Sequence, residues 1–144
     1  MPDLPLPLLL FALCLPAGAD QLPAPPDPTF HLAANRSDVS RADLPRVAAH
    51  CQYAAEHPTS LLQIAGHTDR KGGDEYNFAI GQKHAEMLLH RLHACGVELK
   101  RMEALSLGKQ RPLDPGHNRA ADARNRRVEI HYRLADAPAA PPLQ

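Results

Sequence analysis

The chain has 144 residues, which is the length of one domain with some sequence to spare. Its 16 basic and 16 acidic side chains give a net charge of zero, so no overall positive field would steer nucleic acid toward it. These numbers exclude a strongly basic nucleic-acid-binding protein and favour a nearly neutral globular domain.

The first residues have the pattern of an export signal. An almost entirely apolar run from Leu4 to Leu15 precedes Ala17-Gly18-Ala19, a small-x-small cleavage pattern. The run is shorter than the about 20 apolar residues of a permanent membrane helix, and no Lys or Arg precedes it. We predict a signal peptide over 1–19; an artefactual start site and a retained anchor are the alternatives.

Cys14 raises the question of lipidation, because lipoprotein signals place a small residue just before the acylated cysteine. Leu13 occupies that position here, which disfavours lipidation. Membrane attachment would follow only if Cys14 were lipidated. After the signal, four prolines within 20–28 indicate an extended linker, and the Pro-rich residues 135–144 are predicted to be a disordered tail.

The folded region begins with a weak candidate strand over 29–34. Asn35 and Ser37 provide turn chemistry, and a helix is predicted from Ser40 or Asp43 to about His57, where Pro58 ends it. Its apolar residues recur at helical spacing: Leu44, Val47, Ala48, Cys51 and Ala55.

Residues 61–84 carry most of the chemical information. Leu61, Leu62 and Ile64 indicate a buried strand, and Gly66 is interpreted as the turn that follows it. Thr68 and Asp69 are then expected at the carboxyl end of this strand.

A long helix is predicted next, over about 75–94, with Asp74 as its N-cap and Gly96 as its C-cap glycine. Asn77, Ile80, Gly81 and His84 lie at i, i+3, i+4 and i+7 and therefore share one face. Because that face begins beside the loop that carries Asp69, the Asp69 carboxylate is expected to face these helix side chains. Such an arrangement suits a small polar ligand.

Two further strands complete the domain. Met102 to Leu107 alternates, residues 111–122 form a polar loop with a short helical turn, and 125–134 places Val128 and Ile130 inward and Arg127 outward. The order β-α-β-α-β-(loop or short α)-β predicts an α+β two-layer sandwich: a mixed four-stranded sheet with helices on one face.

The cysteines and histidines suggest no cofactor. Cys51 and Cys95 fall on apolar helical faces, where buried free thiols are commoner than a disulfide, although an oxidising compartment would permit pairing. His84, His90 and His93 lack further ligands at standard zinc spacing, so no metal is predicted. No nucleophile motif, phosphate loop or carboxylate pair is present, so neither catalytic residues nor an enzyme are predicted.

Several motifs together resemble one family. Gly66-His67-Thr68-Asp69, Gly72, Tyr76-Asn77, Gly96-Val97 and Asn125-Arg126-Arg127-Val128-Glu129 resemble the OmpA carboxyl-terminal-like family, which includes Pal lipoproteins and the periplasmic domain of MotB. The resemblance covers about residues 30–134, the predicted domain 29–134.

The resemblance implies an envelope protein of the periplasm or the periplasmic face of the outer membrane. Its members bind peptidoglycan non-covalently at the diaminopimelate of the stem peptide, and envelope proteins are further expected partners. It implies that Asp69 pairs with the ligand ammonium group, that Thr68 and Asn77 line the site, and that Ile80 forms an apolar wall. One charge of each sign on a rigid frame recognises a zwitterion well.

The chain departs from the family at two places. Family members have an arginine on this helix that pairs with the ligand carboxylate, and this chain has His84 at that position. Gly81 stands where the family usually has a serine. A mostly neutral histidine cannot make the two-pronged carboxylate contact, although Lys83, Arg70 or an arginine of the last strand, Arg127 in particular, would compensate if it reached the site. Asn35 stands in a turn that is usually acidic, and it keeps a hydrogen bond without the charge.

Each site residue also has a structural interpretation. Asp69 could cap its own turn, Asn77 could hold the loop, His84 could be a half-buried helix residue, and Arg126 or Arg127 could form a structural ion pair. Two hypotheses therefore stand: an envelope-anchoring module that binds peptidoglycan, and a protein-interaction or assembly module that keeps the fold without tight diaminopimelate binding.

Overall fold

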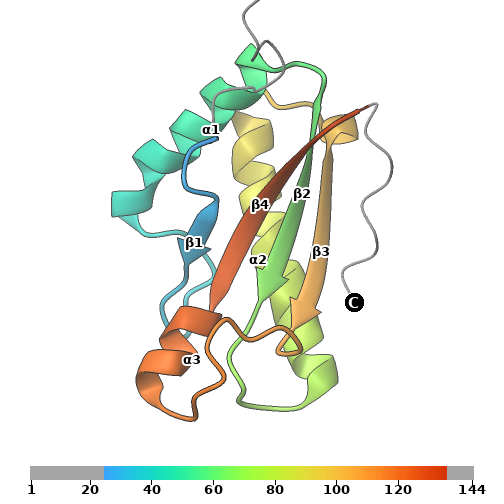
Figure 1. The fold of residues 1–144 in the computed structure, drawn as a ribbon. Coiled ribbons are helices and arrows are strands. Elements are labelled where there is room, and N and C mark those ends of the chain that lie inside the picture. Colours follow the sequence, from blue (N-terminus) through green and yellow to red (C-terminus); the bar gives the residue numbers. More distant parts are fainter. Residues whose placement is uncertain (1–24, 136–144) are drawn as a thin grey trace, which may run out of the picture.

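A computed structural model describes residues 25–135 (Figure 1). The elements follow the predicted order: β1 (Thr29–His31), η1 (Arg41–Asp43), α1 (Leu44–Glu56), β2 (Ser60–His67), α2 (Asp74–Ala94), η2 (Leu99–Arg101), β3 (Met102–Gly108), α3 (Arg119–Asn125) and β4 (Arg127–Leu134). The predicted signal peptide, the linker up to residue 24 and the tail from residue 136 lie outside the described residues. No helix within 25–135 combines the length and apolar character of a membrane span.

The four strands form one mixed sheet in the order β1-β4-β2-β3. Strands β2 and β3 are parallel, and β4 lies between β1 and β2, antiparallel to both. Helices α1 and α2 cover one face, while α3 lies at the end of the sheet where β2 and β3 finish (Figure 1). The predicted α+β two-layer fold is confirmed.

The core lies between the sheet and the two long helices. Val128 and Ile130 of β4 point into it beside Ile64 of β2, and Leu88 and Leu92 of α2 close it from the other side. The period of two in β4 leaves the alternate side chains on the uncovered face of the sheet.

Gly66 has a different role from the predicted turn, because it lies inside β2. A Cβ there would overlap the backbone carbonyl of Gly81 on α2, and a Cβ on Gly81 would overlap the hydroxyl oxygen of Ser106 on β3. The helix thus rests directly on the strand backbones. At position 81, where the family that the sequence resembles usually has a serine, a glycine fits this packing because the Ser106 hydroxyl lies directly against it.

The start of α1 agrees with the prediction, but that of α2 does not. Ser40 caps the short η1 by accepting a bond from the Asp43 amide at 3.2 Å, and Asp43 is the N-cap of α1, which begins at Leu44. The N-cap of α2 is Gly73, without a side-chain bond, so Asp74 is the first helical residue and not the predicted cap. Strand β1 ends at His31, three residues before the predicted end.

Cys51 and Cys95 form a disulfide, which corrects the expectation of free thiols. Cys51 is half-buried on α1, but Cys95 is the exposed C-cap residue of α2 and not part of its apolar face. The two helices pack against each other on the sheet and bring the Cα atoms to 6.2 Å, within the usual range for a disulfide.

Candidate functional site

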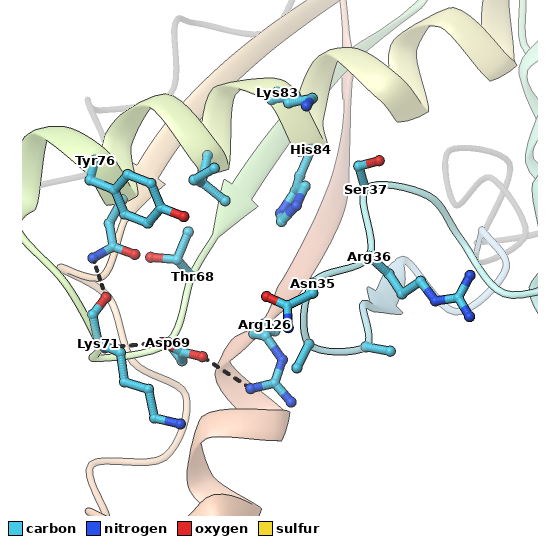
Figure 2. A pocket seen from close by; sticks show the side chains of 14 residues that line it. Asn35, Arg36, Ser37, Thr68, Asp69, Lys71, Tyr76, Lys83, His84 and Arg126 are labelled. Carbon is cyan, nitrogen blue, oxygen red and sulfur yellow. Dashed lines mark hydrogen bonds and ion pairs between the residues drawn. The ribbon is translucent and has the colours of Figure 1, made fainter.

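A cavity of about 450 Å³ opens between the end of β2, the first turns of α2 and the loop after β1 (Figure 2). Polar and charged side chains dominate its wall. It is lined by Ala33, Ala34, Asn35, Arg36, Ser37, Thr68, Asp69, Lys71, Tyr76, Asn77, Ile80, Lys83, His84 and Arg126.

Asp69 is the carboxylate of this cavity, and it is held on both oxygens. Oδ1 accepts a hydrogen bond from the Lys71 backbone amide at 3.0 Å, which closes a turn. Oδ2 accepts a hydrogen bond from Nη1 of Arg126, also at 3.0 Å. The side chain is 16% exposed. Because a carboxylate oxygen can accept two hydrogen bonds, each oxygen keeps capacity for a ligand donor.

The loop between β2 and α2 is fastened to the short helix α3. Arg70 and Lys71 both face the buried carboxylate of Asp122, at 3.1 and 3.8 Å. From α2, the Asn77 side chain donates to the carbonyls of Lys71 and Gly73 at 2.7 and 3.0 Å. These contacts fix the position of Asp69, and they support the interpretation that Asn77 holds the loop.

Two buried polar atoms of the wall find no hydrogen-bond partner within residues 25–135: Oγ1 of Thr68 and Nδ1 of His84. His84 is 8% exposed and projects from α2 toward Asn35 (Figure 2). Burial is the main cause that lowers its pKa, and the neighbouring Lys83 adds to the effect, while the nearby backbone of Arg36 opposes it. A neutral imidazole therefore faces the cavity at neutral pH.

The loop after β1 supplies the opposite wall. Asn35 has a φ of 59°, a left-handed conformation that asparagine tolerates better than most residues, so the turn explains the residue type. The exposed side chain of Arg36 extends away from Asp69 (Figure 2), and Lys83 is likewise exposed at the rim. Among the described residues, no carboxylate pairs with either cation.

The structure brings six of the seven predicted ligand-binding residues to this cavity: Asn35, Thr68, Asp69, Asn77, Ile80 and His84. Arg127 is the exception, and grouping it with Asp69 is corrected. As the first residue of β4 it points to the uncovered face, where its Nε bonds Glu129 at 2.5 Å. Arg70, paired with Asp122, does not line the cavity either.

Sequence reasoning missed Arg126 as the arginine of the site. This residue is the C-cap of α3 and not part of β4, so the alternation of the strand does not govern its direction. Lys71 and Tyr76 were also missed. Lys71 follows Asp69 by two residues and Tyr76 directly precedes Asn77 on α2, and this proximity was the available signal. The sequence does not show which way either side chain points.

Arg127 belongs to a second cavity, of about 270 Å³, on the uncovered face of the sheet. His67 and Glu129 also line it. A hydrogen bond from His131, the nearby His67 ring at 3.7 Å and the pair with Arg127 hold the pKa of Glu129 far below its usual range. No group of three or more His, Cys, Asp or Glu side chains within 25–135 is arranged to hold a metal ion.

Burial of histidines predicts acid sensitivity of the fold. The pKa of His84 and that of His50 are both lowered by burial, from the ordinary 6.5. Below that value the unfolded chain takes up protons that the folded protein resists, so the free energy of unfolding should fall from pH 7.5 to pH 5.5. Urea unfolding of His84→Asn should show a smaller fall than the wild type, whereas His90→Asn, on the exposed side of α2, should keep the wild-type fall. Equal falls in the wild type and His84→Asn would contradict the assignment.

The OmpA family model matches residues 32–126, and the chain belongs to the OmpA family. The match spans the cavity, from the loop after β1 to Arg126.

The peptidoglycan-associated lipoprotein of Legionella pneumophila is 38% identical over 109 residues, which are 76% of this chain and 62% of that protein. The crystal structure of the peptidoglycan-associated lipoprotein from Burkholderia pseudomallei superposes with a TM-score of 0.72 at 37% identity, over 74% of this chain and 90% of that one.

The carboxyl-terminal domain of Helicobacter pylori MotB shares the fold, with a TM-score of 0.68 at 18% identity over 75% of this chain and 84% of that one. The chain spans roughly three fifths of the length of the first curated relatives, at 62%, 56%, 68% and 60%.

Proposed function

We propose that this chain is an envelope module that binds peptidoglycan non-covalently and tethers the envelope to the cell wall, without catalysis. It works in the periplasm or on the periplasmic face of the outer membrane. Membership of the OmpA family and similarity to proteins named peptidoglycan-associated lipoproteins support this function. The single structural observation that carries it is the fixed, partly exposed carboxylate of Asp69 inside a cavity of about 450 Å³.

The ligand group proposed for this cavity is the diaminopimelate of a stem peptide. Its ammonium group would donate to the free acceptor capacity of Asp69, beside Thr68 in the wall of the cavity. The other polar end would lie toward His84, and Ile80 would contact the carbon chain between the two ends. Lys83 and Arg36 at the rim are available to carboxylates of the ligand outside the cavity.

A second candidate is a protein-interaction or assembly module that has lost tight peptidoglycan binding. The ion pair between Asp69 and Arg126 favours it, because Arg126 already neutralises the carboxylate that would hold the ammonium group. His84 favours it for the same reason, since it carries no charge where the family has an arginine.

An Asp69→Asn substitution distinguishes the peptidoglycan-binding module from the interaction module. Asparagine keeps an oxygen for the Lys71 amide but removes the charge, so the turn survives while the ammonium contact weakens. We expect affinity for isolated peptidoglycan sacculi, measured by co-sedimentation of the full chain, to fall about thirtyfold. Asp74→Asn is the matched control, because Asp74 is an exposed acid on the first turn of α2 outside the cavity, and it should bind as the wild type does.

Two results would reject the proposal in favour of the interaction module. Wild-type protein that stays in the supernatant would mean that the fold is kept without the ligand. Equal pelleting of Asp69→Asn and the wild type would place any wall binding elsewhere on the molecule.

A further inference from the structure

The wall of the large cavity carries more positive than negative charge. Its charged residues are four bases and one acid: Arg36, Lys71, Lys83, Arg126 and Asp69. Arg126 is paired with Asp69 at 3.0 Å, and Lys71 faces the carboxylate of Asp122 at 3.8 Å. Arg36 and Lys83 form no ion pair within residues 25–135. Two cations without a counterion are thus left at the cavity of a chain whose net charge is zero.

The acids nearest to these two cations in the chain are bound elsewhere. Asp38, two residues after Arg36, accepts hydrogen bonds from Arg91 of α2, with Oδ1 at 2.7 Å from Nε. Glu86, one turn beyond Lys83 on α2, accepts a hydrogen bond from a glutamine side chain at 3.0 Å. The positive charges of Arg36 and Lys83 are therefore available to a ligand.

Both cations lie at the mouth of the cavity, on the side of His84 (Figure 2). Their side chains are exposed, and that of Arg36 extends out of the cavity, away from Asp69. Ser37, also exposed, adds a hydroxyl group to the same rim. A guanidinium and an ammonium group on one rim can hold a carboxylate of a ligand that leaves the cavity there.

The position proposed for diaminopimelate would lead the stem peptide toward this rim. With the ammonium group on Asp69 and the carbon chain along Ile80, the main-chain end of diaminopimelate leaves the cavity on the side of His84. D-glutamate is joined to that end through its γ-carboxyl group, so its α-carboxylate remains free. Toward the glycan, this carboxylate is the first charged group of the stem that lies outside the cavity.

We propose that Arg36 and Lys83 form an outer subsite for the α-carboxylate of D-glutamate, so that the module prefers stem peptides in which this group is free over those in which it is amidated. This inference rests on the proposed function and names the form of its ligand. The contacts stay in solvent, so each contributes modestly and is weakened by salt. The rim thus supplies a carboxylate contact at the end of the cavity where His84 provides no charge.

The test compares two synthetic tetrapeptides, L-Ala-γ-D-Glu-meso-diaminopimelate-D-Ala and the same peptide with the α-carboxyl of D-glutamate amidated. Both keep the diaminopimelate ammonium group and every other carboxylate. Isothermal titration of the full chain at pH 7.5 and low salt should give a Kd about fivefold higher for the amidated peptide. In about 0.5 M NaCl the ratio of the two Kd values should fall toward one, because salt screens exposed charges.

An Arg36→Gln/Lys83→Gln variant should bind the two peptides equally, because it removes both charges and leaves the interior of the cavity unchanged. Neither substitution breaks an ion pair of the described residues, so the circular dichroism spectrum should match that of the wild type. Lys100→Gln is the matched control. It removes a positive charge that is 81% exposed on η2, outside the cavity, and should keep the fivefold ratio.

The outcomes separate this inference from the proposed function. Asp69→Asn should weaken both peptides by the same factor, since it acts on the ammonium contact alone. If the wild type binds both peptides equally, or if the double variant keeps the wild-type ratio, the outer subsite is wrong while peptidoglycan binding stands. If neither peptide nor sacculi bind, the proposed function fails and the inference with it.

Discussion

Replacing Gly66 with alanine should lower the free energy of unfolding by about 3 kcal/mol. The added methyl would overlap the backbone carbonyl of Gly81, and backbone cannot rotate away as a side chain can. Either α2 lifts from β2 or the strand bends, and both movements disturb the core that Leu88 and Leu92 close. Urea unfolding followed by circular dichroism measures the loss.

Gly73→Ala is the matched control for this substitution. It makes the same chemical change a few residues away, at a position with a φ of −77° and no atom within 4 Å of the new Cβ. Its stability should stay within about 0.5 kcal/mol of the wild type. If both variants were equally stable, the close approach of α2 to β2 would be wrong.

The architecture could be predicted because its signals are periodic. Alternation from Val128 to Ile130 defines β4, and helical spacing followed by Gly96 defines α2 with its end, so the α+β order was obtained from the sequence. The role of Gly66 could not be obtained in this way. A glycine that permits a turn and a glycine that permits contact between two backbones look the same in a sequence, and only the partner, Gly81, separates them.

The candidate site was predictable where its residues follow regular elements. Asn77, Ile80 and His84 share a face because α2 is regular, and Thr68 and Asp69 follow the end of β2. Sequence reasoning assigned Arg127 to the site, whereas the structure places Arg126 there. The exact start of β4 decides which of the two arginines faces Asp69. Element ends are where sequence patterns are weakest, since no periodicity extends past them.

The departures from the family are local in their physical consequences. Gly81 leaves room for the Ser106 hydroxyl, so α2 packs closely against the sheet. His84 instead changes the chemistry of the cavity wall while keeping its place on the helix. Fold and ligand preference can therefore change independently, which is why the fold alone leaves the form of the ligand to be tested.

Reduction of the disulfide between Cys51 and Cys95 should lower the free energy of unfolding by about 4 kcal/mol. The two residues are 44 positions apart, and a cross-link over a loop of that length removes much of the freedom of the unfolded chain. The folded state should change little, because α1 and α2 also pack against the sheet through Val47 and Leu88. Urea unfolding with and without a thiol-free reductant measures the difference.

A Cys51→Ala/Cys95→Ala variant separates loss of the disulfide from every other effect of the reductant, since it lacks both bonded thiols. It should unfold at the midpoint of the reduced wild type, and the reductant should leave that midpoint unchanged. Wild-type protein that unfolds at the same urea concentration in both conditions would show that the two thiols are not linked in solution. Because the bond joins the carboxyl end of α2 to α1, far along the helix from His84, its loss should reduce the amount of folded protein without altering the preference of the remaining folded molecules among ligands.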